Sequence, residues 1–175
     1  MVTSDGYILT LHRIPHGKNM ATVSTKPVLV QHGLLSSSAD WVITGVEHGL
    51  GFILADEGYD VWLGNGRGNY NSRNHTTLDP NTDAEFWHFS WHEIGAIDIP
   101  AMIDHILETT GQPNLYYVGH SQGTTVFYVM ATTRPEYNDK IKAHFSLAPI
   151  AYMKHMTSPL MQILAYFVGP IDALF

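Results

Sequence analysis

A serine between two glycines is the feature of this sequence that could perform covalent chemistry. Ser121 lies in the segment Gly119-His120-Ser121-Gln122-Gly123, which has the pattern G-x-S-x-G. The apolar run at 115–118 predicts a short buried strand before it, and apolar residues four apart predict a helix over 122–133 after it. A sharp turn between strand and helix, with glycines that allow close approach, holds a serine hydroxyl exposed. We therefore expect Ser121 to be a nucleophile, and the alternative is a serine in an ordinary tight turn.

The same turn predicts where a negatively charged intermediate would be stabilised. The backbone N–H of Gln122 would lie at the start of the helix, where free donors and the helix dipole favour an oxyanion. A second donor is expected from Leu34, because His32-Gly33-Leu34 directly follows a predicted buried strand at 27–31. In hydrolases with a G-x-S-x-G turn, a His-Gly motif after such a strand supplies this N–H. An ordinary turn from strand to loop is the alternative.

Composition argues against several classes of protein. The chain has 175 residues, enough for one domain or a piece of one, and its net charge of −7 argues against a nucleic-acid partner. It has no cysteine and no H-E-x-x-H pattern, so we expect no disulfide, no metal site and no cofactor. We also expect no transmembrane segment and no signal peptide in this chain. The oligomeric state stays open.

Strands and helices alternate along the chain. Strands are predicted at 7–14, 27–31, 59–63, 115–118 and 141–149, helices at 49–58, 90–110 and 122–133, and a loop at 36–41. Gly58 would cap the first helix, and Ser90 and Glu93 would form a capping box at the start of the second. Pro100 either kinks that second helix or begins it anew. The alternation predicts an α/β fold, a mostly parallel sheet with helices on both faces.

Two shorter patterns carry weaker implications. The segment Gly64-Asn65-Gly66-Arg67-Gly68-Asn69 resembles a phosphate-cradling loop, but it lacks the G-x-G-x-x-G spacing. We therefore expect a tight loop beside the active site and not a nucleotide site. The triplet Asn74-His75-Thr76 is an N-glycosylation sequon, so Asn74 is a possible glycosylation site if the protein is secretory.

A series of segments in unbroken order resembles one family, the acid lipases, which are gastric, lysosomal and related insect lipases with the α/β-hydrolase fold. These segments are Thr3–Leu9, Arg13–Gly17, Gln31–Leu34, Asp60–Asn69, Phe86–Ile94, Asp98–Ala101 and Tyr117–Thr124. The match covers residues 2–150 and is far more specific than the serine motif by itself.

The resemblance implies a lipase, a carboxylic ester hydrolase that acts on neutral lipids such as triacylglycerols or cholesteryl esters at a lipid–water interface. It implies that Ser121 is the nucleophile and that Leu34 and Gln122 supply the oxyanion donors. It implies a full-length protein in the secretory lumen, in the lysosome or outside the cell. Residues 1–149 would form the N-terminal part of the hydrolase core. Residues 150–175, rich in Met and aromatic side chains, would begin a cap over the acyl pocket, with ordinary core packing as the alternative.

The acid and the base of the catalytic triad are expected outside this chain. The order in the superfamily is Ser, then Asp or Glu, then His, and in these lipases both later residues follow the cap. Asp172 lies in the expected cap, while His144 and His155 have the wrong order and context, so we assign none of them. We therefore expect an α/β-hydrolase fold truncated before its last strands. The alternative is a catalytically inactive lipase that binds only lipid or a partner.

Another reaction of this fold, such as peptide or epoxide hydrolysis, is a further alternative. Epoxide hydrolases of this fold carry an aspartate at the turn, so Ser121 argues against that reaction.

Overall fold

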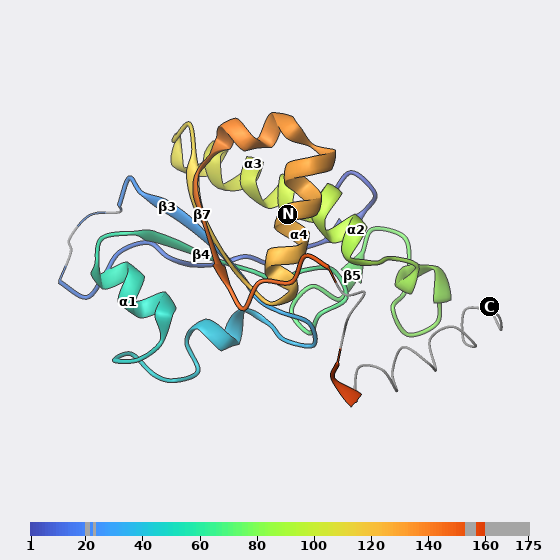
Figure 1. Cartoon of the computed structure of the whole chain (residues 1–175). Helices are drawn as coiled ribbons and strands as arrows, with labels where there is room; N and C mark the ends of the chain where they lie inside the picture. Colours follow the sequence, from blue (N-terminus) through green and yellow to red (C-terminus); the bar gives the residue numbers. More distant parts are fainter. Residues whose placement is uncertain (20–21, 23, 153–156, 160–175) are drawn as a thin grey trace.

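A five-stranded sheet forms the centre of the molecule. The computed structural model describes residues 1–19, 22, 24–152 and 157–159. The sheet has the order β2-β4-β3-β6-β7, with β2 (His12–Ile14), β4 (Asp60–Gly64), β3 (Pro27–Gln31), β6 (Leu115–His120) and β7 (Ile141–Leu147). Only β2 is antiparallel to its neighbour, so the prediction of a mostly parallel sheet is confirmed (Figure 1).

The prediction of one N-terminal strand is wrong, because the segment forms two strands in two sheets. β1 (Tyr7–Ile8) pairs with β5 (Asn74–His75) in a two-stranded sheet, whereas β2 joins the main sheet. Side chains from the loop after β4 bind the backbone between them. Asn65 Nδ2 donates to the Thr10 carbonyl at 3.0 Å, and the Thr10 N–H donates to Ser72 Oγ at 3.0 Å. These bonds satisfy the backbone in place of a strand partner, so the strand is interrupted there.

The helices lie near their predicted positions, with corrections to their ends and types. The α-helices are α1 (Leu50–Asp56), α2 (Trp91–Glu93), α3 (Ile99–Thr110) and α4 (Gln122–Thr133). The other helical turns are 3-10 turns at Ser38–Trp41, Ala84–Trp87 and Pro135–Lys140, and a π-helical turn at Ile94–Asp98. The segment 36–41 is therefore not a plain loop, because Ser37 Oγ accepts the Ala39 N–H and starts a helical turn. Gly58 follows α1 with a left-handed φ of 85°, as its capping role requires.

The second predicted helix is continuous but changes type in its middle. The capping box is present, since Ser90 Oγ accepts the His92 N–H and Glu93 accepts the Ser90 N–H. Pro100 lies in the first turn of α3, directly after the π-helical turn, so it begins α3 anew. In that turn Gly95 lies against α4, where an added Cβ would be 2.6 Å from the Cβ of Val129. A side chain at this position would force the π-helical turn away from α4.

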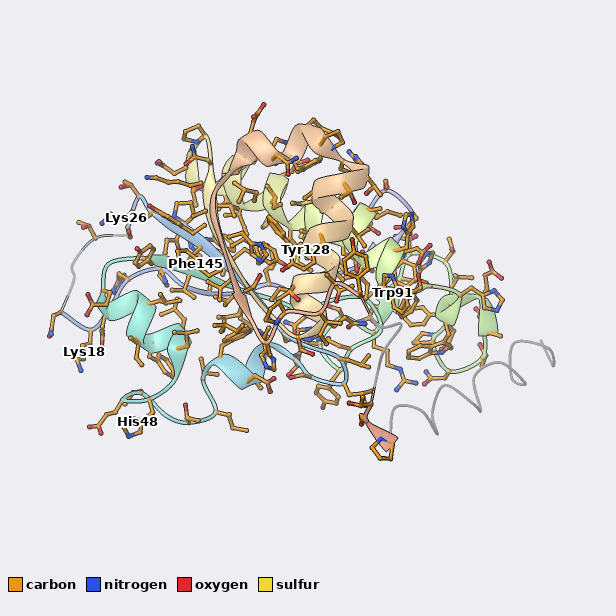
Figure 2. The ribbon with its side chains drawn as sticks, viewed as in Figure 1. Lys18, Lys26, His48, Trp91, Tyr128 and Phe145 are labelled. Carbon is orange, nitrogen blue, oxygen red and sulfur yellow. The ribbon has the colours of Figure 1, made fainter. Side chains whose placement is uncertain are left out.

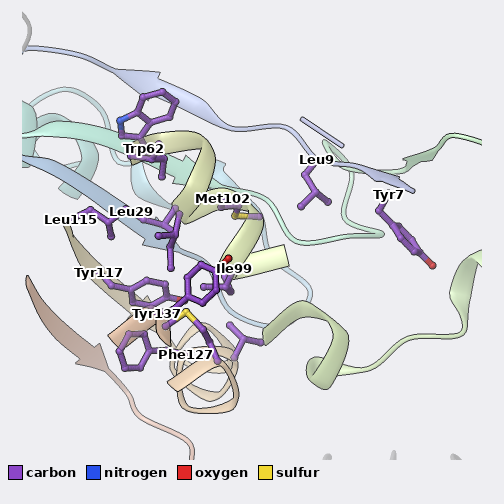
Figure 3. Packing of buried hydrophobic residues seen from close by; sticks show 14 of the residues in the cluster. Tyr7, Leu9, Leu29, Trp62, Ile99, Met102, Leu115, Tyr117, Phe127 and Tyr137 are labelled. Atoms are coloured by element: carbon purple, nitrogen blue, oxygen red, sulfur yellow. The ribbon is translucent and has the colours of Figure 1, made fainter. Parts of the chain in front are cut away.

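The two faces of the sheet carry separate hydrophobic clusters. Successive strand residues point to opposite faces. Leu29, Trp62 and Tyr117 therefore pack with α3 and α4 in one cluster, as Figure 3 shows. Val30 and Leu63 pack on the other face with residues of α1 and of the 3-10 turn before it. The residues predicted for the buried side of the second helix are all fully buried: Ile99, Met102, Ile103 and Ile106. Helices on both faces are thus confirmed.

Residues 150–175, which we interpret as the beginning of a cap, lie largely outside the described residues. The described residue Ile150 is held by α4: its N–H donates to Thr124 Oγ1 at 2.9 Å, and its carbonyl accepts from Thr125 Oγ1 at 2.7 Å. These bonds anchor the chain that leaves β7 on the first turn of α4. Among the described residues, no helix has the length and apolar character needed to cross a membrane.

Candidate active site

Ser121 lies at the turn from β6 to α4 in a backbone conformation that few residues adopt. Its φ is 52° and its ψ is −117°, which lies outside the regions normally open to residues with a side chain. Its N–H donates to the Leu147 carbonyl of β7 at 2.9 Å, and its carbonyl accepts from the Thr124 N–H at 2.9 Å and from the Thr124 hydroxyl at 2.6 Å. Bonds to β7 and to α4 thus hold the strained residue, and its side chain stays partly exposed.

The two glycines of the motif are required by close backbone contacts. A Cβ on Gly119 would lie 2.6 Å from the Gly123 carbonyl oxygen, and a Cβ on Gly123 would lie 2.4 Å from the Gln31 carbonyl oxygen. Both distances are well below van der Waals contact. The end of β3 and the first turn of α4 therefore touch through their backbones. This contact brings the loop after β3 next to Ser121.

Leu34 and Gln122 present free backbone donors on either side of this contact. Gln122 is the first residue of α4, and within the described residues neither its N–H nor the N–H of Leu34 donates to a protein acceptor. Gly33 lies directly against the serine, because a Cβ there would be 3.0 Å from the Cβ of Ser121 and 3.3 Å from Nδ1 of His120. The fold therefore brings the predicted nucleophile and both predicted oxyanion donors together.

A cavity of about 750 Å³ opens beside these residues. Its wall contains apolar side chains from four parts of the chain: Leu34, Leu35, Tyr70, Phe89, Trp91, Ile94 and Val126. Leu35 and Tyr70 are 96% and 93% exposed, so they lie at its mouth, and Trp91 lies on the first turn of α2 (Figure 2). Polar groups of the loop after β3 and of the loop after β4 also line the cavity, so the second loop lies beside the candidate site.

One buried arginine in the cavity wall is fully neutralised. The Arg67 guanidinium donates to Asp98 at 2.7 and 2.9 Å and to Asp5 at 2.6 and 3.1 Å, and it stacks on the Tyr7 ring at 4.0 Å. Burial by itself would lower the pKa of Arg67, but the bonds from Asp98 and Asp5 outweigh it and raise that pKa above its ordinary value. Arg67 therefore stays charged and paired, so it offers no free cation to a substrate.

No histidine of the described residues hydrogen-bonds to Ser121. His144 stacks on Phe127 with ring centroids 3.6 Å apart, its Nε2 lies 3.2 Å from Ser146 Oγ, and burial lowers its pKa. His120 is exposed at the end of β6. His155 and Asp172 lie outside the described residues. The triad base and acid therefore stay unassigned. The described residues also contain no cluster of His, Asp and Glu that could hold a metal.

The sequence missed the polar network that supports the two loops. Asn65 is fully buried, and its Oδ1 accepts from the Ser38 N–H at 3.0 Å and from Asn69 Nδ2 at 2.9 Å. The Gly-Asn alternation after β4 was the available signal, but sequence spacing does not reveal which loop an asparagine binds. The sequon residue Asn74 lies in β5 with its side chain exposed.

Comparisons with known proteins identify the family. A model described as alpha/beta hydrolase fold matches residues 26–173, and one described as partial alpha/beta-hydrolase lipase region matches residues 1–45. Lipase 1 of Drosophila melanogaster is 56% identical over 154 residues, covering 88% of this chain and 34% of the relative. The human lysosomal acid lipase/cholesteryl ester hydrolase is 51% identical over 163 residues, covering 92% of this chain and 41% of the relative. The chain thus spans less than half the length of the curated relatives it matches.

A solved structure supports the same fold. The monoacylglycerol lipase of Paleococcus ferrophilus superposes with a TM-score of 0.56 at 23% identity, covering 93% of this chain and 51% of that one. At this identity the likeness concerns the fold alone. The family model, in contrast, covers most of the chain and includes the strained serine turn. The chain therefore belongs to the α/β-hydrolase family, within which its sequence resembles the acid lipases.

Proposed function

We propose that this chain carries the nucleophile and the oxyanion hole of a lipase, with Ser121 attacking an ester and the N–H groups of Leu34 and Gln122 binding the oxyanion. The observation that carries the proposal is the strained backbone of Ser121 beside two free backbone donors. Gly119, His120 and Gly123 complete the turn that holds it. Strain of this kind is maintained where a fold presents a reactive group.

In this mechanism Ser121 Oγ attacks the carbonyl carbon while its proton passes to a base. The carbonyl oxygen takes up the negative charge and accepts hydrogen bonds from Leu34 and Gln122. The bond to the alcohol then breaks, the alcohol leaves with the proton, and the acyl group remains on Ser121 until water releases it as an acid. Because no described histidine reaches Ser121, the base belongs to residues outside the described ones.

The proposed substrate is a neutral lipid, a triacylglycerol or a cholesteryl ester. The cavity wall combines apolar side chains with polar groups, its arginine is neutralised by Asp98 and Asp5, and its other charged side chain is the acidic Asp40. Such a wall favours an uncharged acyl chain over an acidic substrate. The name of the human relative, a lysosomal acid lipase and cholesteryl ester hydrolase, agrees with this class. Secretory, lysosomal or extracellular localisation and glycosylation of exposed Asn74 belong to the same proposal.

Active-site labelling tests the nucleophile. The purified protein, in a form that includes the residues supplying the base, is treated with a fluorophosphonate probe beside Ser121→Ala and Ser146→Ala. Ser146 is the matched control because it is an exposed serine whose hydroxyl contacts a histidine, His144. We expect labelling of the wild type and of Ser146→Ala, and none of Ser121→Ala. Labelling that persists in Ser121→Ala would contradict the assignment. An unlabelled wild type with a folded circular-dichroism spectrum would favour the alternative, a chain that only binds lipid or a partner.

A substrate panel tests the proposed class. Trioleoylglycerol and cholesteryl oleate emulsions are compared with a soluble short-chain ester and with a phospholipid that carries a charged headgroup. We expect fatty-acid release from the neutral emulsions to exceed release from the phospholipid, because the described residues of the cavity wall offer no free cation. Preferential cleavage of the charged lipid would contradict the proposal of a neutral substrate while leaving Ser121 as the nucleophile.

A further inference from the structure

The side chain of His32 is buried between the oxyanion loop and the loop after β4, and both of its ring nitrogens are used. His32 is 7% exposed. Its Nδ1 lies 2.7 Å from the carbonyl oxygen of Gly33, and its Nε2 lies 3.3 Å from the Gly66 nitrogen and 3.0 Å from Asn69 Nδ2. A carbonyl oxygen only accepts, so Nδ1 carries the proton. Nε2 then accepts from the Gly66 N–H and from Asn69, and the ring is neutral in one tautomer.

The bond from His32 acts on the peptide unit that contains the Leu34 N–H. The Gly33 carbonyl and the Leu34 N–H belong to one trans peptide, so both lie in its plane and point in opposite directions. Holding the oxygen by Nδ1–H therefore fixes the direction of the N–H. Donation to the carbonyl also polarises the peptide, which strengthens the opposite N–H as a donor.

Asn69 holds the ring of His32 in this orientation. Its Oδ1 accepts from the N–H groups of Asn71 at 2.9 Å and Ser72 at 3.0 Å, and its Nδ2 also donates to Asn65 Oδ1 at 2.9 Å. These bonds fix which end of the amide faces His32, so Asn69 presents a donor to Nε2. The alternative tautomer would place two N–H groups against each other there. Asn69 thus selects the tautomer that reaches Gly33.

We infer that His32 and Asn69 are positioning residues for the oxyanion hole, which set the Leu34 N–H through the carbonyl of Gly33. This inference rests on the proposed function, because it concerns the donor that the hydrolysis uses. Neither side chain touches the reacting atoms. Their effect is therefore expected on the transition state and not on substrate binding.

The rate of fluorophosphonate labelling measures the effect, because the phosphoryl oxygen occupies the oxyanion position. We expect His32→Ala to label about ten- to hundredfold more slowly than the wild type, since loss of one oxyanion donor costs about 10²–10³ in rate. His32→Asn keeps a donor near the place of Nδ1 and is expected to label close to the wild-type rate. His16→Ala is the matched control, because exposed His16 makes the same Nδ1 contact with its own next carbonyl at 3.0 Å, far from Ser121 in the fold. It should label like the wild type.

Asn69→Ala provides a second variant if His32→Ala fails to fold, which thermal unfolding reports. It should label several-fold more slowly, and with a soluble ester it should lower kcat and leave KM nearly unchanged. Nitrogen-15 spectra of the histidine rings give a readout that does not need activity. We expect a proton on Nδ1 of His32 and an unprotonated Nε2 at neutral pH.

The outcomes separate this inference from the proposed function. A wild type that does not label means that the proposed function fails, and this inference fails with it. If the wild type labels and folded His32→Ala or folded Asn69→Ala labels at the same rate, the positioning roles are overturned. Ser121 then remains the nucleophile. A proton on Nε2 of His32 in the wild type also overturns the inference.

Discussion

At the scale of single residues, the site depends on positions where a side chain is not tolerated. Ser121 keeps a left-handed φ because its N–H is bound to β7 and its carbonyl to Thr124. Three positions around it are glycines because an added Cβ would lie too close to neighbouring atoms: Gly33, Gly119 and Gly123. The exposed serine is thus a consequence of how closely β3, β6 and α4 approach each other.

Gly123→Ala tests this dependence. Its new Cβ would lie 2.4 Å from the Gln31 carbonyl oxygen, so β3 and α4 must separate. We expect the free energy of unfolding to fall by about 3 kcal/mol, the upper part of the range for overpacking. Gly111→Ala is the control, because Gly111 has a left-handed φ of 66° but nothing within 4 Å of its added Cβ. It should cost only about 1 kcal/mol from backbone strain. Urea unfolding measures both, and equal losses would contradict the contact argument.

At the scale of elements, the arginine after β4 joins three parts of the chain. Arg67 connects this loop to Asp98 at the end of the π-helical turn and to Asp5 in the N-terminal segment. The Arg67 N–H also donates to Asp98 at 3.0 Å. The loop that holds Asn69 is therefore fixed on the π-helical turn before α3 by charged groups that are almost entirely buried.

Asp98→Asn tests that connection. It removes one of the two carboxylate charges that face the buried Arg67 guanidinium, whose side chain is 1% exposed, and leaves only Asp5 as its partner. We expect the free energy of unfolding to fall by about 3 kcal/mol, as when one partner of a buried pair is lost. Glu136→Gln breaks the solvent-exposed pair with Arg134 and should produce no measurable change. Thermal unfolding measures both variants. If the free energy of unfolding falls no more in Asp98→Asn than in Glu136→Gln, the buried pair does not stabilise the fold.

At the scale of the whole molecule, the helices cover the two sheet faces unequally. α3 and α4 cover one face, while α1 covers the other face over β3 and β4. Near β7, where α1 does not cover the second face, an apolar hollow remains open. Val118 and Tyr116 of β6 and Phe145 and Leu147 of β7 line it. Phe145 is 53% exposed and projects from β7 (Figure 2). Within the described part of the chain β7 pairs only with β6, and exposed apolar surface beside such a strand edge favours association.

Phe145→Lys tests this consequence in a chain of these 175 residues. We expect the wild type to form soluble oligomers that increase with concentration, and Phe145→Lys to reduce them several-fold, since it adds charge at the apolar edge. Ile43→Lys is the control, because Ile43 is 76% exposed but lies outside this hollow. Light scattering after size-exclusion chromatography measures the mass. A wild type that remains monomeric at all concentrations would contradict the prediction.

The sequence by itself determined most of the elements. Periodicity and capping residues predicted α4 at 122–133, the capping box at Ser90 and the buried side of α3, because these features depend on contacts a few residues apart. The serine motif and its flanking strand and helix were predicted for the same reason. The N-terminal strand was predicted wrongly, because distant side chains from the loop after β4 interrupt it.

Only the tertiary structure decided how the candidate site is assembled. Ser121, Leu34 and Gln122 were named from motifs, but their proximity depends on the backbone contact between Gly123 and Gln31, which no spacing reveals. The tautomer of His32 and its bond to Asn69 likewise join loops from different strands. Helices, caps and turns depend on contacts between residues close together in the sequence, so the sequence predicts them. A hydrogen-bond partner across the sheet is defined only when the strands have their order and register.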